Sequence, residues 1–345
     1  MITRMKLALI SVSLGIVLFL GISFFAEPNI VKIIPQQQEK TSTAGVEEKQ
    51  PIKIILTGDI MLDRGVEYMV KTEGKGDFRF PFSKIADYLK EADIVFGNLE
   101  GVISDKGIKV GGIYSFRADP EAIEGLTSAG FNVLSLANNH ALDYSREALK
   151  DCLVRLDEAG ISHVGAGLTE EDAFSPLIKE INGVKIAFLA YANLGSDAWR
   201  ATEDNPGIAW ISQNDVDKIK QDIKSAKEKS DILIVSLHFG EEYQKTPNQA
   251  QIDLSRMAID AGADLLVGHH PHVVQPNEKY QNGWIFYSLG NFVFDQSFSE
   301  ETMQSQIIEL SIEGSKIKEV NIAEIKINDF FQPYLKTSDE TNTKL

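Results

Sequence analysis

Three of the six histidines in this chain stand within four positions, in the segment Gly268-His269-His270-Pro271-His272. The run before it, residues 263–267, predicts a buried strand that ends at the glycine. At pH 7 imidazoles are mostly neutral, and the neutral form is the one that binds metal ions. A polar turn with solvated histidines is the alternative interpretation of this segment taken alone. Imidazoles crowded at the end of a strand therefore indicate a metal site or a catalytic site.

Four other predicted strands also end in polar residues. These clusters contain Asp59 and Asp63, Asn98 and Glu100, Asn138 to His140 with Asp143, and His238 with Glu242. In open α/β sheets ligands bind beyond the carboxyl ends of the strands, so we expect the five clusters to converge. Carboxylate, amide and imidazole ligands without thiolates suit Zn, Mn or Fe in a hydrolytic site. We predict one or two divalent ions, and two ions sharing a carboxylate would clamp a phosphoryl or acyl oxygen.

Several residues near these clusters are candidates for catalysis or substrate binding. His140 follows Asn139 directly and is placed to protonate a leaving group. Arg117 suits a planar substrate carboxylate, although a surface ion pair with Asp119 is an equal alternative. The remaining substrate-binding candidates are Glu242, Tyr243 and Asn291. Glu242 and Tyr243 lie just beyond His238 and are placed to orient its ring, whereas Asn291 has a polar turn as its alternative interpretation.

Composition excludes some partners. The 345 residues carry a formal net charge of −16, with a pI near 4.9, which argues against nucleic acid because phosphate binding needs a basic surface. An anionic substrate would need a local cation, and a metal ion would supply it. Cys152 is the single cysteine, so no intrachain disulfide forms, and we expect this side chain to fill the core.

The beginning of the sequence predicts a membrane anchor. Residues 7–26 contain no charge, and a run of roughly 20 apolar residues spans a bilayer. Arg4 and Lys6 orient residues 1–6 toward the cytoplasm. A cleaved signal peptide is the alternative, and both interpretations place the rest of the chain outside the cytoplasmic membrane. A polar linker is predicted over 27–51, one folded domain over 52–330, and a flexible tail over 331–345.

Apolar runs alternate with helical patterns across the predicted domain. Strands are expected at 52–57, 94–96, 133–136, 177–180, 184–190, 232–237, 265–267, 284–288, 306–312 and 320–327, with a further one starting at 113. Helices are expected at 83–91, 120–129, 145–159, 214–229 and 249–261. Continuous Ile, Leu and Val runs indicate strands buried on both faces, and the turn Asn182-Gly183 indicates a hairpin. The pattern predicts one α/β domain with mixed sheets.

The order of these motifs resembles the calcineurin-like metallophosphoesterase superfamily. Three longer phrases, at 138–143, 270–273 and 287–294, are similar to the CapA family, which belongs to the poly-γ-glutamate capsule machinery of bacteria. The resemblance covers residues 52–296. It implies a four-layer αββα sandwich, in which two mixed sheets lie face to face with helices outside.

The resemblance also implies roles for individual residues. The metal ligands it implies are Asp59, Asn139, His238, His270 and His272, and His140 is the implied catalytic histidine. We group Asp143, which closes the same phrase, with His140 as a catalytic candidate.

Two positions depart from the superfamily pattern. Met61 stands where the first motif has a histidine, and Asn98 stands where the second has an aspartate that bridges two metals. Glu100 is the nearest carboxylate to the second position. Either Glu100 takes over the bridging role, or the centre is reduced to one ion.

Three hypotheses for the function follow. The first is a membrane-anchored component of poly-γ-glutamate production or export, whose partners would be the γ-glutamyl chain, membrane-embedded polymer synthase subunits and the cytoplasmic membrane. The second is a metal-dependent envelope hydrolase that cleaves phosphoesters or amides. The third is a non-catalytic scaffold that recruits synthase subunits, in which the metal site has no function.

Overall fold

The computed structural model describes residues 50–336, and two mixed β-sheets form its centre. The strands of the first sheet run in the order β18-β17-β16-β1-β2-β5-β6, and β15 pairs with β1 at Asp59 and Ile60, beyond the segment of β1 that pairs with β16. Their bounds are β1 (Ile52–Ile60), β2 (Ile94–Leu99), β5 (Val133–Ser135), β6 (Ser162–Val164), β15 (Asn291–Val293), β16 (Gln304–Glu313), β17 (Lys316–Ile327) and β18 (Pro333–Leu335). Strands β1, β2, β5, β6 and β15 are parallel, whereas β16, β17 and β18 add antiparallel neighbours.

The second sheet has the order β13-β14-β12-β11-β9-β8. Its strands are β8 (Leu177–Ile181), β9 (Val184–Ala192), β11 (Ile232–His238), β12 (Leu265–His269), β13 (Asn277–Tyr280) and β14 (Gly283–Phe286). Four parallel strands at its centre are flanked by an antiparallel strand at each edge. Two short pairs complete the strands: β3 (Val102–Ile103) with β4 (Arg117–Ala118), and β7 (Ala166–Gly167) with β10 (Gly207–Ile208).

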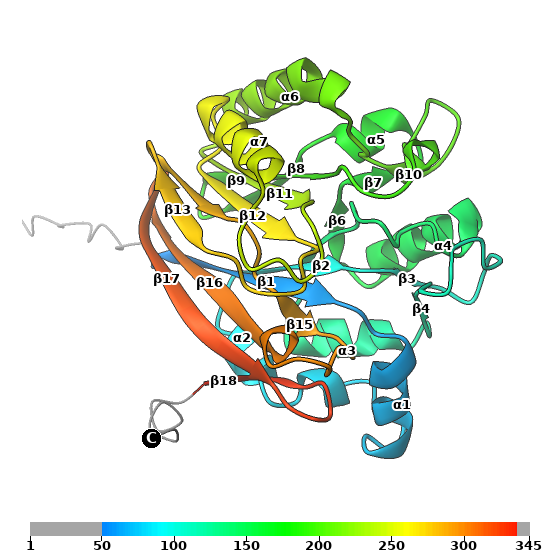
Figure 1. Cartoon of the computed structure of the whole chain (residues 1–345). Coiled ribbons are helices and arrows are strands. Elements are labelled where there is room, and N and C mark those ends of the chain that lie inside the picture. Colours follow the sequence, from blue (N-terminus) through cyan, green and yellow to red (C-terminus); the bar gives the residue numbers. More distant parts are fainter. Residues whose placement is uncertain (1–49, 337–345) are drawn as a thin grey trace, which may run out of the picture. The chain divides into compact units, whose positions relative to one another are not determined.

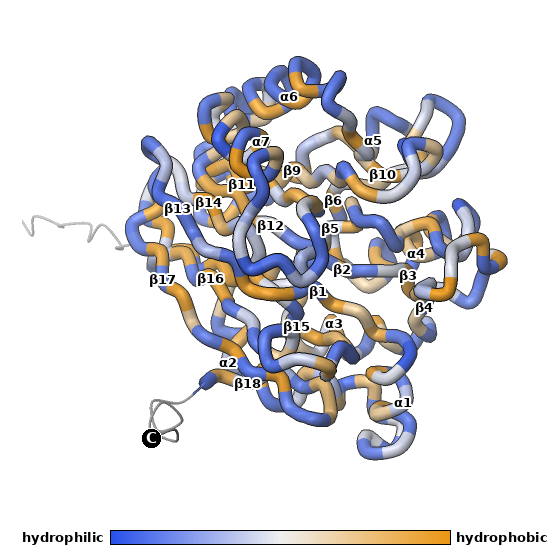
Figure 2. The backbone as a smooth tube through the Cα atoms, in the orientation of Figure 1, coloured by the Kyte–Doolittle hydropathy of each residue, from blue (hydrophilic) through white to orange (hydrophobic). Residues whose placement is uncertain are grey.

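The two sheets pack face to face, with helices on their outer faces (Figure 1). Phe96 of β2 and Phe188 of β9 stack across the interface, with ring centroids 5.6 Å apart. A second apolar cluster joins the far face of the second sheet to Ile219 and Ile223 of α6 (Val216–Glu228) and Ala258 of α7 (Gln249–Asp260). Hydrophobic and hydrophilic residues alternate along α6 (Figure 2), as expected of a helix with one face on a sheet. The mixed α/β fold is therefore confirmed.

The other helices are α1 (Arg64–Thr72), α2 (Ala86–Leu89), α3 (Ala122–Ala129), α4 (Ser145–Glu158) and α5 (Glu170–Phe174). Helices α1 to α4 lie on the side of the first sheet or at its ends, whereas α5 packs against the second sheet, where the Phe174 ring contacts Tyr191 of β9. Short 3₁₀ turns occupy Phe80–Phe82, Asp197–Trp199, Gln213–Asp215 and Glu301–Met303. Helix α3 ends at Gly130, which has φ +92°, a conformation that glycine adopts at little cost.

Several local predictions are confirmed. The hairpin of β8 and β9 turns at Asn182 and Gly183, with φ +54° and +82°, as a two-residue turn requires. Helices α4, α6 and α7 begin and end within two residues of the predicted bounds. Cys152 is fully buried on the inner face of α4.

Three predictions need correction. The helix expected over 83–91 is only the single turn of α2, preceded by a 3₁₀ turn that contains Pro81. No strand starts at Ile113 in the described chain: this side chain is 84% exposed, and only Arg117–Ala118 pairs. Part of the tail predicted over 331–345 is structured, because β18 (Pro333–Leu335) pairs with β17 and the buried Gln332 donates to the carbonyl of Phe80.

The predicted anchor, residues 7–26, and most of the predicted linker lie outside the described residues. Among the residues that are described, no helix combines the length and the hydrophobicity needed to cross a membrane.

Candidate metal centre

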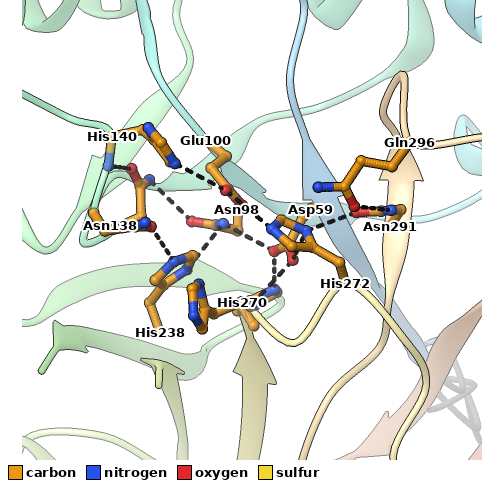
Figure 3. Close-up of polar contacts among 12 residues, drawn as sticks. Asp59, Asn98, Glu100, Asn138, His140, His238, His270, His272, Asn291 and Gln296 are labelled. Carbon is orange, nitrogen blue, oxygen red and sulfur yellow. Dashed lines mark hydrogen bonds and ion pairs between the residues drawn. The ribbon is translucent and has the colours of Figure 1, made fainter. Parts of the chain in front are cut away.

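The carboxyl ends of the parallel strands bring the polar clusters together. In the first sheet, Asp59 at the end of β1 lies opposite Asn98 on β2 and Asn291 on β15. In the second sheet, His238 at the end of β11 lies opposite His269 at the end of β12. Side chains from these two edges meet in one site (Figure 3), so the predicted convergence is confirmed.

The histidine segment leaves β12 through a tight, strained path. A Cβ on Gly268 would lie 2.0 Å from the carbonyl oxygen of Tyr287, so only glycine allows the two backbones to pass. His270 and His272 then adopt φ values of +97° and +58°. Such conformations cost of order 1–3 kcal/mol each in non-glycine residues and cluster at functional sites. The fold therefore maintains an unfavourable backbone in order to turn these imidazoles inward.

Asp59 is the fixed anion of the site. It is fully buried, and its Oδ1 accepts from Asn98 Nδ2 at 2.9 Å, while the backbone N–H of His270 donates to Oδ2 at 3.1 Å. His269 Nδ1 lies 3.0 Å from Oδ1. Burial acts to raise the pKa of Asp59, but the hydrogen bond and charge of His269 outweigh it, so the pKa falls below its ordinary value. Asp59 is thus ionised at neutral pH.

Glu100 is a buried carboxylate without a hydrogen-bond partner. It follows β2, is 1% exposed, and neither carboxylate oxygen has a donor among the described residues. Its Oε1 lies 3.6 Å from His272 Nε2 and 3.8 Å from His140 Nε2. Burial, followed by the negative charge of Asp59, raises the pKa of Glu100 well above its usual range. A carboxylate in such surroundings calls for a cation.

Asn291 fixes the tautomer of His272. The Asn291 amide nitrogen donates to Gln296 Oε1 at 3.1 Å and to the carbonyl of Thr302 at 3.0 Å, so its Oδ1 is the acceptor. His272 Nδ1 lies 2.9 Å from that oxygen and therefore carries the proton. The lone pair of His272 is consequently on Nε2, the atom that faces Glu100. Asn291, predicted to bind substrate, is fully buried and instead orients a metal-ligand candidate.

A second group of predicted ligands lies beside the first. His238 Nε2 is 2.7 Å from Asn139 Oδ1, and the rings of His238 and His270 lie 5.0 Å apart between centroids. Burial, then the neighbouring histidines, lowers the pKa of His238 well below its usual value and that of His270 to about 3. The buried Nδ1 of His270 has no described partner. Both imidazoles are therefore neutral, and His270 Nδ1 is available as a ligand, whereas both ring nitrogens of His238 contact asparagines.

His140 and Asp143 form a pair at the edge of the site. His140 Nδ1 lies 2.7 Å from Asp143 Oδ2, which also accepts the backbone N–H of Phe116 at 3.0 Å. The Phe116 ring packs on the imidazole, with centroids 4.1 Å apart. Asp143 therefore holds the ring with Nε2 directed at Glu100 (Figure 3).

The two departures from the superfamily pattern have a structural explanation. The sulfur of Met61 accepts the N–H of Asp63 at 3.1 Å, so Met61 supports the turn after β1. The amide of Asn98 is used at both ends, because Nδ2 donates to Asp59 and Oδ1 accepts from Asn138. The second carboxylate of the site is instead Glu100, two residues further on, which supports the alternative in which Glu100 takes over.

The candidates for substrate binding separate into two places. The Arg117 guanidinium donates to the carbonyls of Lys106 and Gly107 and lies over the Tyr144 ring, while Asp119 pairs with Lys71. These contacts support neither of the two interpretations of Arg117, which were a role in substrate binding and a surface ion pair with Asp119.

Glu242 and Tyr243 lie beside His272, not beside His238. The Tyr243 ring is 6.0 Å from that of His272, and a Glu242 oxygen lies within 4.8 Å of ring nitrogens of His270 and His272. Both ring nitrogens of His238 contact asparagines, so Glu242 does not orient the His238 ring as the sequence suggested.

Sequence reasoning missed two contributors. His269 was counted only as part of the histidine segment, yet its position at the end of β12 opposite His238 places it on Asp59. Arg64 pairs with Asp295 and lies over the Phe116 ring. The Asp295 carboxylate also accepts the N–H of Gly65, so it anchors the start of α1. No sequence pattern links Arg64 to a residue 231 positions away.

The donor set fits a divalent cation. A carboxylate oxygen of Asp59, one of Glu100 and a ring nitrogen of His272 lie within 4.8 Å of one another. All three residues are buried, and the unpartnered Glu100 oxygens are the atoms that an ion would satisfy. Carboxylates and imidazoles without thiolates suit Mn, Zn or Fe, and no contact here selects among these metals.

Comparison with known proteins agrees with this geometry. The family model described as "Bacterial capsule synthesis protein PGA_cap" matches residues 53–296. The capsule biosynthesis protein CapA of Bacillus anthracis is 33% identical over 85% of this chain and 72% of its own length. The PGA biosynthesis protein CapA of Bacillus subtilis is 34% identical over 79% of this chain and 70% of its own length.

Among solved structures, the Haemophilus influenzae NAD nucleotidase aligns with a TM-score of 0.48 at 10% identity, covering 84% of this chain and 54% of that one. This likeness is too low to say anything further about the chain. The family model matches most of the described domain, and both CapA relatives are more than 30% identical to this chain. These two findings are sufficient to assign the chain to a family. This chain belongs to the family of bacterial capsule synthesis proteins PGA_cap.

Proposed function

We propose that this protein is a metal-binding component of poly-γ-glutamate biosynthesis or export that acts on the γ-glutamyl chain. Its relatives are named for capsule and PGA biosynthesis, and it shares their family. The observation that carries the metal part of the proposal is Glu100, a buried carboxylate without a hydrogen-bond donor beside Asp59 and His272. A divalent cation between these three side chains would satisfy it.

The residues of the site have separable roles in this proposal. A bound cation would act as a Lewis acid on a carbonyl or phosphoryl oxygen of the substrate. Asp59, Glu100 and His272 would hold it. Asp143 fixes the His140 ring through Nδ1, so Nε2 is the atom that would give a proton to the leaving group.

A metal-dependent hydrolase of phosphoesters or γ-glutamyl amides is the second candidate. The His140–Asp143 pair favours it, because a protein that only binds polymer has no use for an oriented proton donor. In both cases we propose that residues 7–26 anchor the domain, with 1–6 in the cytoplasm and the site on the extracytoplasmic side. Membrane-embedded synthase subunits are the proposed partners.

The test uses the full chain purified in detergent. Elemental analysis after incubation with Mn²⁺ or Zn²⁺ should show bound metal in the wild type and loss of metal in Glu100→Gln. Turnover of γ-glutamyl peptides and of a generic phosphodiester then separates polymer chemistry from general hydrolysis. Absence of bound metal in the wild type would refute the proposal.

The scaffold hypothesis makes the opposite genetic prediction. In poly-γ-glutamate-producing cells that depend on this protein, a scaffold would tolerate His140→Ala and His270→Ala but not removal of residues 7–26. Our proposal expects both substitutions to reduce polymer output by at least about tenfold, since oriented acid–base groups contribute about 10²–10⁴ to a rate. Unchanged output in both variants would favour the scaffold.

A further inference from the structure

We propose that Glu242 is an additional ligand of the cation, which it reaches from the exposed side of the site. This inference rests on the proposed metal centre and extends it. A carboxylate oxygen of Glu242 and ring nitrogens of His270 and His272 lie within 4.8 Å of one another. The buried group of Asp59, Glu100 and His272 meets the same criterion. His272 is common to both groups, so the two groups adjoin at one imidazole.

The tautomer of His272 leaves one ring nitrogen for an ion. Because the Nδ1–H donates to Asn291 Oδ1, Nε2 is the only ring nitrogen of His272 with a lone pair for a metal. An ion bound at Nε2 has Glu100 on its buried side, 3.6 Å from that nitrogen. Glu242 is exposed and therefore approaches from the opposite side.

The number of buried donors leaves room for this ligand. Asp59, Glu100, His272 and the adjacent His270 offer four buried donors, which suffice for tetrahedral zinc, whereas octahedral ions such as Mn²⁺ take six ligands. Met61 and Asn98, the two nearest alternatives in the sequence pattern, are engaged in other contacts. Glu242 is the carboxylate that can complete the set from the protein.

The loop that carries Glu242 is fixed to the histidine segment. The N–H of Tyr243 donates to the carbonyl of Pro271 at 2.8 Å, between His270 and His272. Tyr243 itself has φ +63°, a strained conformation that turns the loop back over the site. The backbone next to Glu242 is therefore tied to the segment that carries the imidazoles.

A second loop closes over the first. Gln296 donates to the Tyr243 hydroxyl at 3.2 Å, the Phe298 ring packs edge-on against Tyr243 at 5.1 Å, and Lys245 pairs with Glu301 at 2.6 Å. Gln296 also accepts from Asn291, the residue that orients His272. One network thus positions both His272 and the loop of Glu242, as expected if the two residues bind one ion.

The charge of the site supports the same conclusion. Asp59 and Glu100 share one group with His272, and Glu242 shares the other. The guanidinium of Arg64 is already paired with Asp295. Three carboxylates therefore gather around His272, and a divalent ion would neutralise this excess of negative charge.

The experiment measures Mn²⁺ binding by the full chain in detergent, after removal of metal with a chelator. Free Mn²⁺ is followed by its electron paramagnetic resonance signal, which needs no enzymatic activity. We expect Glu242→Gln to weaken Mn²⁺ binding by about 10–100-fold, the range measured for groups that support a metal site. Glu242→His should retain Zn²⁺ binding better than Mn²⁺ binding, because imidazole suits zinc.

Glu241→Gln is the matched control. Glu241 is the adjacent exposed carboxylate, and its described contact is with Asn248 Nδ2 at 3.4 Å, away from the histidines. Its Mn²⁺ affinity should stay within about twofold of the wild type, a change below 0.5 kcal/mol. Metal-free melting temperatures of the Glu241 and Glu242 variants should agree with that of the wild type, which separates a lost ligand from a damaged fold.

Two outcomes would overturn the inference in distinguishable ways. If Glu242→Gln binds Mn²⁺ as the wild type does while Glu100→Gln does not bind it, Glu242 is not a ligand and the buried centre stands. If the wild type binds no Mn²⁺ or Zn²⁺, the proposed metal centre is itself wrong, and Glu242 has no ion to bind.

Discussion

Replacing Glu100 by glutamine should stabilise the metal-free protein. The wild-type carboxylate is 1% exposed and has no hydrogen-bond donor among the described residues, and a buried charge in that state costs more than the roughly 1–3 kcal/mol of an unsatisfied neutral group. The glutamine amide stays unsatisfied but carries no charge, so we expect a gain of about 2 kcal/mol in the free energy of unfolding at neutral pH. For a domain of this size, that gain corresponds to a rise of about 4 °C in Tm.

Adding the cation should reverse the order of stability. A ligand at a thousand times its Kd stabilises the folded state by about 4 kcal/mol, or roughly 8 °C for the wild type. The Glu100→Gln variant lacks the anionic ligand and should gain little. Melting curves with chelator test the predicted order of stability without metal, and melting curves with excess Mn²⁺ test the order with metal. Glu241→Gln serves as the exposed control.

The pH dependence gives an independent check with a definite sign. The pKa of Glu100 is raised in the folded protein, so its contribution to stability is present at low pH and lost as pH rises through the raised value. In chelator, the advantage of Glu100→Gln over the wild type should therefore grow as pH rises and vanish in acid. A metal-free variant less stable than the wild type at neutral pH would refute this reasoning.

Three further predictions follow from other parts of the structure. Asp143→Asn should lower substrate turnover at least tenfold, measured with a phosphodiester or γ-glutamyl peptide, while Mn²⁺ binding stays unchanged, because Asp143 contacts His140 and no predicted ligand. Gly268→Ala should destabilise the fold by about 3 kcal/mol in a denaturant titration, since its Cβ would lie 2.0 Å from a backbone oxygen. Cys152 should not react with a thiol reagent at pH 8 until the chain unfolds, because burial raises its pKa to about 12; rapid reaction of the native protein would contradict this.

The sequence predicted the central strands well because they are buried on both faces. Continuous apolar runs such as Ile232–His238 can only be interior, and glycine or an Asn-Gly turn marks where several elements end. The short strands β3, β4, β7 and β10 were missed because each has only two residues, and tertiary neighbours alone decide such pairs. The order of the strands is likewise set by long-range pairing.

The metal-ligand candidates were predictable because strand ends and residue types pointed to one edge. What the sequence could not supply was the partner of each group. Asn291 was predicted to contact substrate, but its hydrogen bonds to Gln296 and Thr302 make it the residue that orients His272. Arg117 had the right chemistry for a carboxylate, but local carbonyls occupy its guanidinium. Such assignments depend on geometry within a few ångström, which spacing along a chain does not contain.

The central position of β1 has a consequence for how the chain folds during synthesis. Strand β1 pairs with β2, only some 40 residues later, on one side, but its partner on the other side is β16, which ends at Glu313. Contacts between residues so far apart in the sequence slow folding. Until these contacts form, one apolar edge of β1 stays unpaired. A nascent chain therefore exposes this edge until nearly the whole domain has emerged. We expect its biogenesis to depend on chaperones that shield strand edges, and C-terminal truncations before residue 313 to aggregate.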